Sequence, residues 1–162
     1  DGDAIAIGCG STTWLFSKTL HGLQDLTVIT DSLFVAVELA GEPGIEVRLT
    51  GGIVHHSSSV TYDDRAVEFL SSVSVDKVFI SVEGISLRSR SVTAMSHLNA
   101  VERGIFCCGG HVYVLADHTK FENATVVERL GTFDEIDLLI TDDNIPPELL
   151  KQAVSSGLSI CP

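Results

Sequence analysis

A short run of small and hydroxyl-bearing residues near the start of the chain has the composition of an anion-binding loop. The run comprises Gly8, Cys9, Gly10, Ser11, Thr12 and Thr13. It follows an expected strand and opens an expected helix, whose first backbone N–H groups have no partner within the helix. The helix dipole favours an anion at this end, and glycines let the backbone approach a ligand closely. We interpret the run as an anion site, with a plain turn and a serine cap as the alternative.

Further polar segments follow later strands of the expected sheet. Thr30 and Ser32 flank Asp31 after the second strand, and Gly51 with Gly52 follows the third. Taken alone, the first of these segments is a simple helix cap, and the glycine pair fits a bulge or a turn as well as a ligand contact. Lys120 follows a later strand and supplies a cation that can reach a phosphate, although a solvated loop lysine is the commoner case.

The histidines and paired acids form no recognisable catalytic or metal-binding motif. His55 and His56 are adjacent, but the spacing H-x-x-x-H or H-E-x-x-H of zinc sites is absent from the sequence. The sequence also lacks the G-x-S-x-G motif of serine hydrolases. Asp142 and Asp143 are expected to cap a turn before Pro146. We expect no catalytic residue, no metal and no cofactor.

The polar segments share one edge if the chain folds as its hydrophobic pattern predicts. The expected strands are 4–8, 26–30, 45–50, 77–82, 112–116, 136–141 and 158–161. The expected helices are 11–21, 32–40, 63–71, 96–108 and 146–154. This alternation predicts right-handed crossovers and an α/β fold with three αβα layers around a mostly parallel sheet. Ligands of such sheets bind at the carboxyl ends of the strands. Residues 85–94 are expected to form a loop or a short hairpin near that edge.

Length, charge and cysteine content narrow the class of protein. The 162 residues suit one domain, and the net charge of −12 without a Lys/Arg stripe disfavours nucleic-acid binding by this chain alone. No apolar run approaches the roughly 18–20 residues that span a bilayer, so no membrane role is expected. Four cysteines without a C-x-x-C pair indicate reduced thiols and a cytoplasmic protein.

Seven segments, taken in order, resemble the effector domain of the DeoR family of bacterial sugar-operon repressors. They are Gly10–Thr13, Leu26–Leu33, Leu49–Gly52, Val75–Phe79, Glu83–Ile85, Leu115–Phe121 and Ile136–Asp142. The resemblance covers nearly the whole chain. It implies a fold related to ribose-5-phosphate isomerase and the glucosamine-phosphate deaminases, and an effector that is a phosphorylated sugar or polyol.

The resemblance also implies partners. Members of this family carry an N-terminal winged helix-turn-helix, which the sequence 1–162 does not contain. We therefore expect residues 1–162 to be a single effector-binding domain that reaches DNA only through that missing module. A homo-oligomer is expected, because such regulators bind two-fold symmetric operators.

The resemblance assigns roles to the candidate residues. Gly10, Ser11, Thr12 and Thr13 are expected to hold the phosphate, with Lys120 as counter-charge. Pocket-lining roles are expected for Thr30, Ser32, Gly51 and Gly52. Binding of sugar hydroxyls is expected for Glu83 with Gly84, and for His97. The chain departs from the family pattern at several positions. Gly8 and Glu83 each replace an Asp, and Asp31 replaces an Asn, which brings a negative charge near the anion site. His97 and Leu98 stand where the family often carries acidic residues.

A sensor is expected rather than an enzyme. The related isomerase moves a proton with several carboxylates and a nearby lysine. In the corresponding stretch this chain offers Glu83 but no lysine between Lys77 and Lys120, and a general base needs partners that tune its pKa. A small sugar-phosphate isomerase or deaminase is the alternative, and an assembly module with a vestigial pocket is a third.

Overall fold

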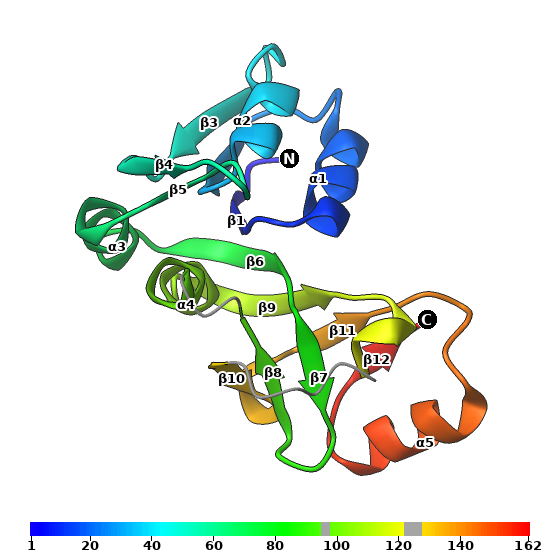
Figure 1. Cartoon of the computed structure of the whole chain (residues 1–162). Coiled ribbons are helices and arrows are strands. Elements are labelled where there is room, and N and C mark those ends of the chain that lie inside the picture. The colour runs from blue at the N-terminus through cyan, green and yellow to red at the C-terminus, as the bar shows by residue number, and fades with distance from the viewer. Residues whose placement is uncertain (95–97, 122–127) are drawn as a thin grey trace.

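A seven-stranded parallel sheet forms the centre of the molecule. The computed structural model describes residues 1–94, 98–121 and 128–162. Within them the strands run in the order β12-β11-β9-β6-β1-β2-β3, and every neighbouring pair is parallel. Their bounds are β1 Ala4–Ile7, β2 Leu26–Thr30, β3 Ile45–Leu49, β6 Val75–Ser81, β9 Gly109–Leu115, β11 Leu138–Ile140 and β12 Ile160–Cys161. The expected parallel sheet is confirmed (Figure 1).

Helices cover both faces of this sheet. Their bounds are α1 Ser11–Ser17, α2 Leu33–Leu39, α3 Asp64–Ser71, α4 Asn99–Cys107 and α5 Pro147–Ser155. On one face, Ile5 and Ile7 of β1 share a buried cluster with Leu39 of α2. On the other face, Ala6 belongs to a second cluster that contains Leu70 of α3. Because successive side chains of a strand point to opposite faces, β1 is buried from both sides, as the three-layer αβα prediction requires.

The strand order places a switch point beside β1. The chain runs from β1 outward through β2 and β3, then returns to place β6 on the other side of β1. In open parallel sheets, a crevice forms at the carboxyl ends of the strands where the order reverses. The loop Gly8–Thr13 leaves β1 at this point, so the topology positions the expected anion loop where ligands of such sheets bind.

Two small antiparallel sheets complete the described structure. One has the order β10-β8-β7, with bounds β7 Gly84–Ser86, β8 Ser91–Thr93 and β10 Arg129–Thr132. The other is the hairpin of β4 (Ile53–His55) and β5 (Val60–Tyr62). Figure 1 shows the first sheet projecting away from α1 and α2. The hairpin alternative for residues 85–94 is confirmed, whereas β4, β5 and β10 were not among the expected strands.

Helix ends follow the local chemistry of the sequence. The Ser32 hydroxyl accepts from the Val35 N–H at 3.4 Å and caps α2. The Asp63 carboxylate accepts from Arg65 N–H and Ala66 N–H and caps α3. The short α1 continues as a 3₁₀ turn at Lys18–Leu20, so the expected helix 11–21 is regular only over its first two turns. None of the helices described is long and apolar enough to cross a membrane.

Candidate functional site: the loop after β1

The backbone of the loop after β1 is fixed by the end of β6. The Gly8 N–H donates to the Phe79 carbonyl at 2.9 Å, and the Ser81 hydroxyl donates to the Cys9 carbonyl at 2.8 Å. Gly10 has φ 137°, and a Cβ atom placed on it would lie 2.0 Å from Ser81 Oγ. Glycine is therefore required at position 10 by both the dihedral angle and the close approach of β6.

The start of α1 presents unpaired N–H groups. Gly10 is the N-cap, and no side chain caps this helix. The first helical N–H groups, from Ser11 to Thr13, have no intrahelical acceptor. The Thr13 side chain is fully buried and its hydroxyl donates back to the Gly10 carbonyl at 3.0 Å. Ser11 is exposed, so the backbone N–H groups and the Ser11 hydroxyl are the donors that this loop offers to a ligand.

A pocket of about 380 Å³ lies on the β2 side of the loop. Its lining residues, the aromatic pocket from here on, are Cys9, Gly10, Ser11, Trp14, Ser32, Phe34 and Ser58. They come from the loop after β1, the start of α1, the start of α2 and the turn between β4 and β5. The pocket thus combines small hydroxyl-bearing residues with two aromatic rings in its lining, which suits a small ligand that is partly polar and partly apolar.

A second pocket of about 240 Å³ lies on the other side of the same loop. Its lining residues, the acidic pocket from here on, are Thr12, Leu115, Ala116, Asp117, Ile140, Thr141 and Asp142. Partial burial raises the pKa of Asp142, but hydrogen bonds from the His118 N–H and ring outweigh it and lower that pKa to about 2. Asp117 and Asp142 are therefore carboxylates at neutral pH, and this pocket is the less suitable one for an anion.

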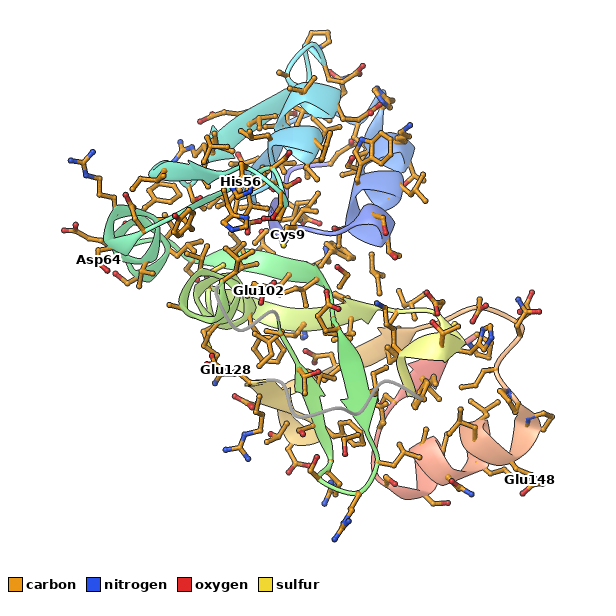
Figure 2. All side chains as sticks on the ribbon, in the orientation of Figure 1. Cys9, His56, Asp64, Glu102, Glu128 and Glu148 are labelled. Atoms are coloured by element: carbon orange, nitrogen blue, oxygen red, sulfur yellow. The ribbon has the colours of Figure 1, made fainter. Side chains whose placement is uncertain are left out.

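A buried acidic cluster lies beneath the loop. Asp31 is fully buried, and of the described groups none donates a hydrogen bond to either of its carboxylate oxygens. The Cys9 thiol donates to Glu102 Oε1 at 3.6 Å, and both side chains are buried. Figure 2 shows Cys9 and Glu102 facing each other from the β1 loop and from α4. Two carboxyl groups are thus held close to the proposed anion loop.

Burial controls the protonation of this cluster. It raises the pKa of Asp31 to about 7, and the negative field of Glu102 adds to the rise. The backbone N–H dipoles of Asp31 and Cys9 and the Cys9 thiol lie near the carboxyl without forming hydrogen bonds to it, and they oppose the rise only in part. Burial, followed by the fields of Asp31 and Glu102, also raises the pKa of the Cys9 thiol. The thiol stays protonated and is a poor nucleophile. The described residues contain no group of three or more metal-ligating side chains.

The structure brings only part of the predicted site together. Gly10, Ser11 and Ser32 line the aromatic pocket, and Thr12 lines the acidic one. Thr30 is fully buried, and its hydroxyl accepts from the Ser32 N–H at 3.1 Å. Four more predicted residues line neither of these two pockets, and they are Gly51, Gly52, Glu83 and Gly84. His97 lies outside the described residues.

The cations lie on different sides of the loop. Lys120 belongs to a 3₁₀ turn, His118–Phe121, which follows β9 on the side of the acidic pocket, and it lines neither pocket. Lys18 lies beside the aromatic pocket, with its Nζ 4.1 Å from the centre of the Trp14 ring. Lys18 could not be selected from the sequence, because its position on the helix becomes informative only once Trp14 is known to line the pocket.

Comparison with known families shows which family the chain belongs to. Residues 1–143 match the family described as the DeoR C terminal sensor domain. The chain belongs to the DeoR family. The match covers the loop after β1, both pockets and the acidic cluster, so these features lie within the DeoR sensor domain.

Named relatives support the same family. The HTH-type transcriptional regulator GolR of Listeria innocua is 31% identical over 156 residues, covering 96% of this chain and 61% of that protein. The HTH-type transcriptional repressor GlcR of Bacillus subtilis is 36% identical over 142 residues, covering 88% of this chain and 54% of that protein. The DeoR sensor domain thus spans about three fifths of the length of these relatives. Their names are those of transcriptional regulators, and the family that residues 1–143 match is described as a sensor domain, as expected for this chain.

Solved structures confirm the expected fold relationship. Ribose 5-phosphate isomerase A of Methanocaldococcus jannaschii matches 75% of this DeoR sensor domain and 47% of the isomerase chain, with a TM-score of 0.53 and 18% sequence identity. A second ribose-5-phosphate isomerase, solved in complex with phospho-erythronic acid, matches the same share of this domain with a TM-score of 0.52 and 19% identity. At this level of identity the likeness concerns the fold.

Three lining residues were missed from the sequence. Trp14 lies one helical turn after Ser11, so its position on α1 was a usable signal. Phe34 lies in the first turn of α2, two residues after the expected cap Ser32, and this position was a second usable signal. The structure leaves its side chain 55% exposed. Ser58 belongs to a hairpin that was not among the expected elements, and no pattern in the sequence indicates its place.

Proposed function

We propose that this domain binds a phosphorylated sugar or polyol, with the phosphate held by the N–H groups and hydroxyls of Gly10–Thr13. The observation that carries the proposal is the pairing of an uncapped helix start with a pocket of small-molecule size on its β2 side. The isomerase of the same fold with phospho-erythronic acid bound supports this ligand class. Ligand binding then shifts the equilibrium between conformations that differ at this edge of the sheet.

In the full-length regulator, we propose, this shift changes the placement of a DNA-binding domain. The relatives GolR and GlcR, an HTH-type transcriptional regulator and an HTH-type transcriptional repressor, support that arrangement. Residues 1–162 act as a single effector domain of a cytoplasmic homo-oligomer. The acidic surface, with its net charge of −12, leaves DNA contact to the other domain.

The remaining predicted residues take supporting roles in this proposal. Thr30, Gly51, Gly52 and Gly84 shape the carboxyl edge of the strands, and Ser32 contacts the ligand. Glu83 and His97 remain proposed contacts to sugar hydroxyls. Lys120 attracts the phosphate through its field without direct contact, so Lys120→Ala is expected to weaken binding by only about two- to fivefold at low salt, and less at high salt.

The substitution Ser11→Asp tests the proposed phosphate site at Gly10–Thr13, called the phosphate seat from here on. A carboxylate at the first helical position favours the helix dipole, so the protein is expected to unfold at the same urea concentration or a slightly higher one. The same carboxylate repels a phosphate about 4 Å away by several kcal/mol, and affinity is expected to fall more than 100-fold. Isothermal titration with a panel of sugar and polyol phosphates measures the effect.

Leu15→Asp is the matched control. Leu15 lies on the same helix, is 57% exposed and does not line the aromatic pocket. The control adds the same charge a full turn away from the seat and is expected to change affinity by less than about threefold. Equal losses in the two variants, or retention of binding by Ser11→Asp, contradict the proposed phosphate seat.

A further inference from the structure

The wall of the aromatic pocket is built for a ligand with an apolar face. Trp14 from α1 and Phe34 from α2 both line the pocket, and their ring centres are 5.9 Å apart. The rest of the lining comes from the loop after β1, through Cys9, Gly10 and Ser11, and from Ser32 and Ser58. A phosphate at the loop therefore leaves the rest of the ligand in a pocket of about 380 Å³ that the two aromatic rings help to line.

Trp14 is held in place before any ligand arrives. Its indole N–H donates to Glu38 Oε2 at 3.2 Å, and the ammonium of Lys18 lies 4.1 Å from the ring centre. These contacts fix the ring from its edge and from one face, and Phe34 packs against it at an interplanar angle of 44°. A preorganised ring loses little freedom when it binds a ligand, so its contact contributes to affinity and not only to shape.

The electrostatics of an aromatic face define what it recognises. The face of the ring is negative, and it attracts the positively polarised C–H groups of a sugar ring while it offers no partner to hydroxyl oxygens. A cyclic sugar gathers several C–H groups on one face. An open-chain polyol spreads its C–H groups and hydroxyls around a flexible chain and cannot present such a face without losing conformational entropy.

We propose that Trp14 and Phe34 select a cyclic sugar phosphate over the corresponding open-chain polyol phosphate. This inference rests on the proposed function, because it places the phosphate at Gly10–Thr13, and it narrows the effector from sugars and polyols to ring forms. The phosphate loop supplies affinity for both kinds of ligand, and the aromatic wall distinguishes them.

Matched pairs of ligands test the selection. Glucose, galactose and mannose 6-phosphates are each compared by isothermal titration with the hexitol phosphate of the same configuration. The wild-type protein is expected to bind the best cyclic ligand about five- to tenfold more tightly than its hexitol. Phe34→Ser and Trp14→Leu are expected to reduce this ratio to about two or less, while affinity for the hexitol phosphate changes little. Leu15→Ala, on the same helix surface, is the control and keeps the wild-type ratio.

The chain contains a single tryptophan, and it lines this pocket. Intrinsic fluorescence of the wild type and of Phe34→Ser therefore reports contact with the Trp14 ring independently of the calorimetric measurement. We expect the cyclic ligand to change the fluorescence more than its hexitol phosphate does. Equal affinity for the two members of every pair, or equal losses for both in Trp14→Leu, overturns the selection while leaving the phosphate seat intact. Absence of binding by every phosphate in the panel overturns the proposed function and the selection with it.

Discussion

Replacing Gly10 with alanine is expected to abolish effector binding and to destabilise the fold by about 2–3 kcal/mol. The added Cβ atom would lie 2.0 Å from Ser81 Oγ, so the serine must rotate and give up its hydrogen bond to the Cys9 carbonyl. That loss costs about 1 kcal/mol. A residue with a Cβ at φ 137° adds about 1–2 kcal/mol of backbone strain. The loop that carries the N–H donors shifts in response, and the phosphate loses its hydrogen bonds to these donors.

Urea unfolding and isothermal titration measure the two effects of Gly10→Ala. Gly41→Ala is the matched control, since a Cβ there meets no atom within 4 Å and φ lies outside the left-handed region. It is expected to leave stability unchanged or raise it slightly. Ser81→Gly in the Gly10→Ala background relieves the steric part but not the strain, so it is expected to recover part of the stability. A Gly10→Ala protein with wild-type stability contradicts the geometry of this loop.

The second large effect concerns Asp31, and its sign follows from the direction of the pKa change. The folded protein holds this carboxyl protonated up to about pH 7, whereas the unfolded chain ionises near 3.8. Between these values the folded state binds more protons, so stability falls as the pH rises. Each pH unit in this range lowers the free energy of unfolding by about 1.4 kcal/mol, and the full loss at pH 8 is about 4 kcal/mol.

Asp31→Asn removes this penalty and leaves a buried amide. The amide brings two N–H donors where the protonated carboxyl has one O–H donor, and the additional unsatisfied donor costs about 1–3 kcal/mol. The variant is therefore expected to exceed the wild type by about 1–3 kcal/mol at pH 8, with the advantage shrinking and then reversing as the pH falls toward 4. Urea unfolding from pH 4 to pH 8 measures the difference. Asp143→Asn, at an exposed position, is the control and is expected to show no such pH-dependent gain.

An Asp31→Asn protein that is less stable than the wild type at pH 8 contradicts the description of this cluster. It would mean that a partner group stabilises the charged Asp31 carboxylate in the folded protein in solution. The result bears on function as well, because a charged Asp31 beneath the anion loop opposes the binding of a phosphate.

The layered fold was predictable because its elements have strong local signals. The apolar runs of β1 and β2 are typical of strands buried on both faces, and Ser32 and Asp63 have the chemistry of helix caps. The family assignment from ordered motifs was predictable for the same reason. By contrast, β4 is a strand of three residues whose Ile53 and Val54 are half exposed or more, so neither length nor alternation identified the hairpin.

The candidate site was predictable only where a single loop defines it. Gly10 and Ser11 were found because the donors of a helix start are local. The burial of Asp31 was not found, since a polar residue after a strand is normally solvated, and only the packing of α4 against the loop places Glu102 and Cys9 beside it. Lys120 was paired with the loop because both follow strands of one sheet edge, but the lysine lies on the side of the acidic pocket.

The structure of a complex with a sugar phosphate tests the central claim most directly. The tightest-binding ligand of the titration panel is the one to crystallise. The phosphate oxygens are predicted to lie about 2.7–3.2 Å from the backbone nitrogens of Ser11, Thr12 and Thr13, with the sugar in the aromatic pocket beside Trp14. A phosphate bound in the acidic pocket, or anywhere away from Gly10–Thr13, would contradict the assignment of this loop as the phosphate seat.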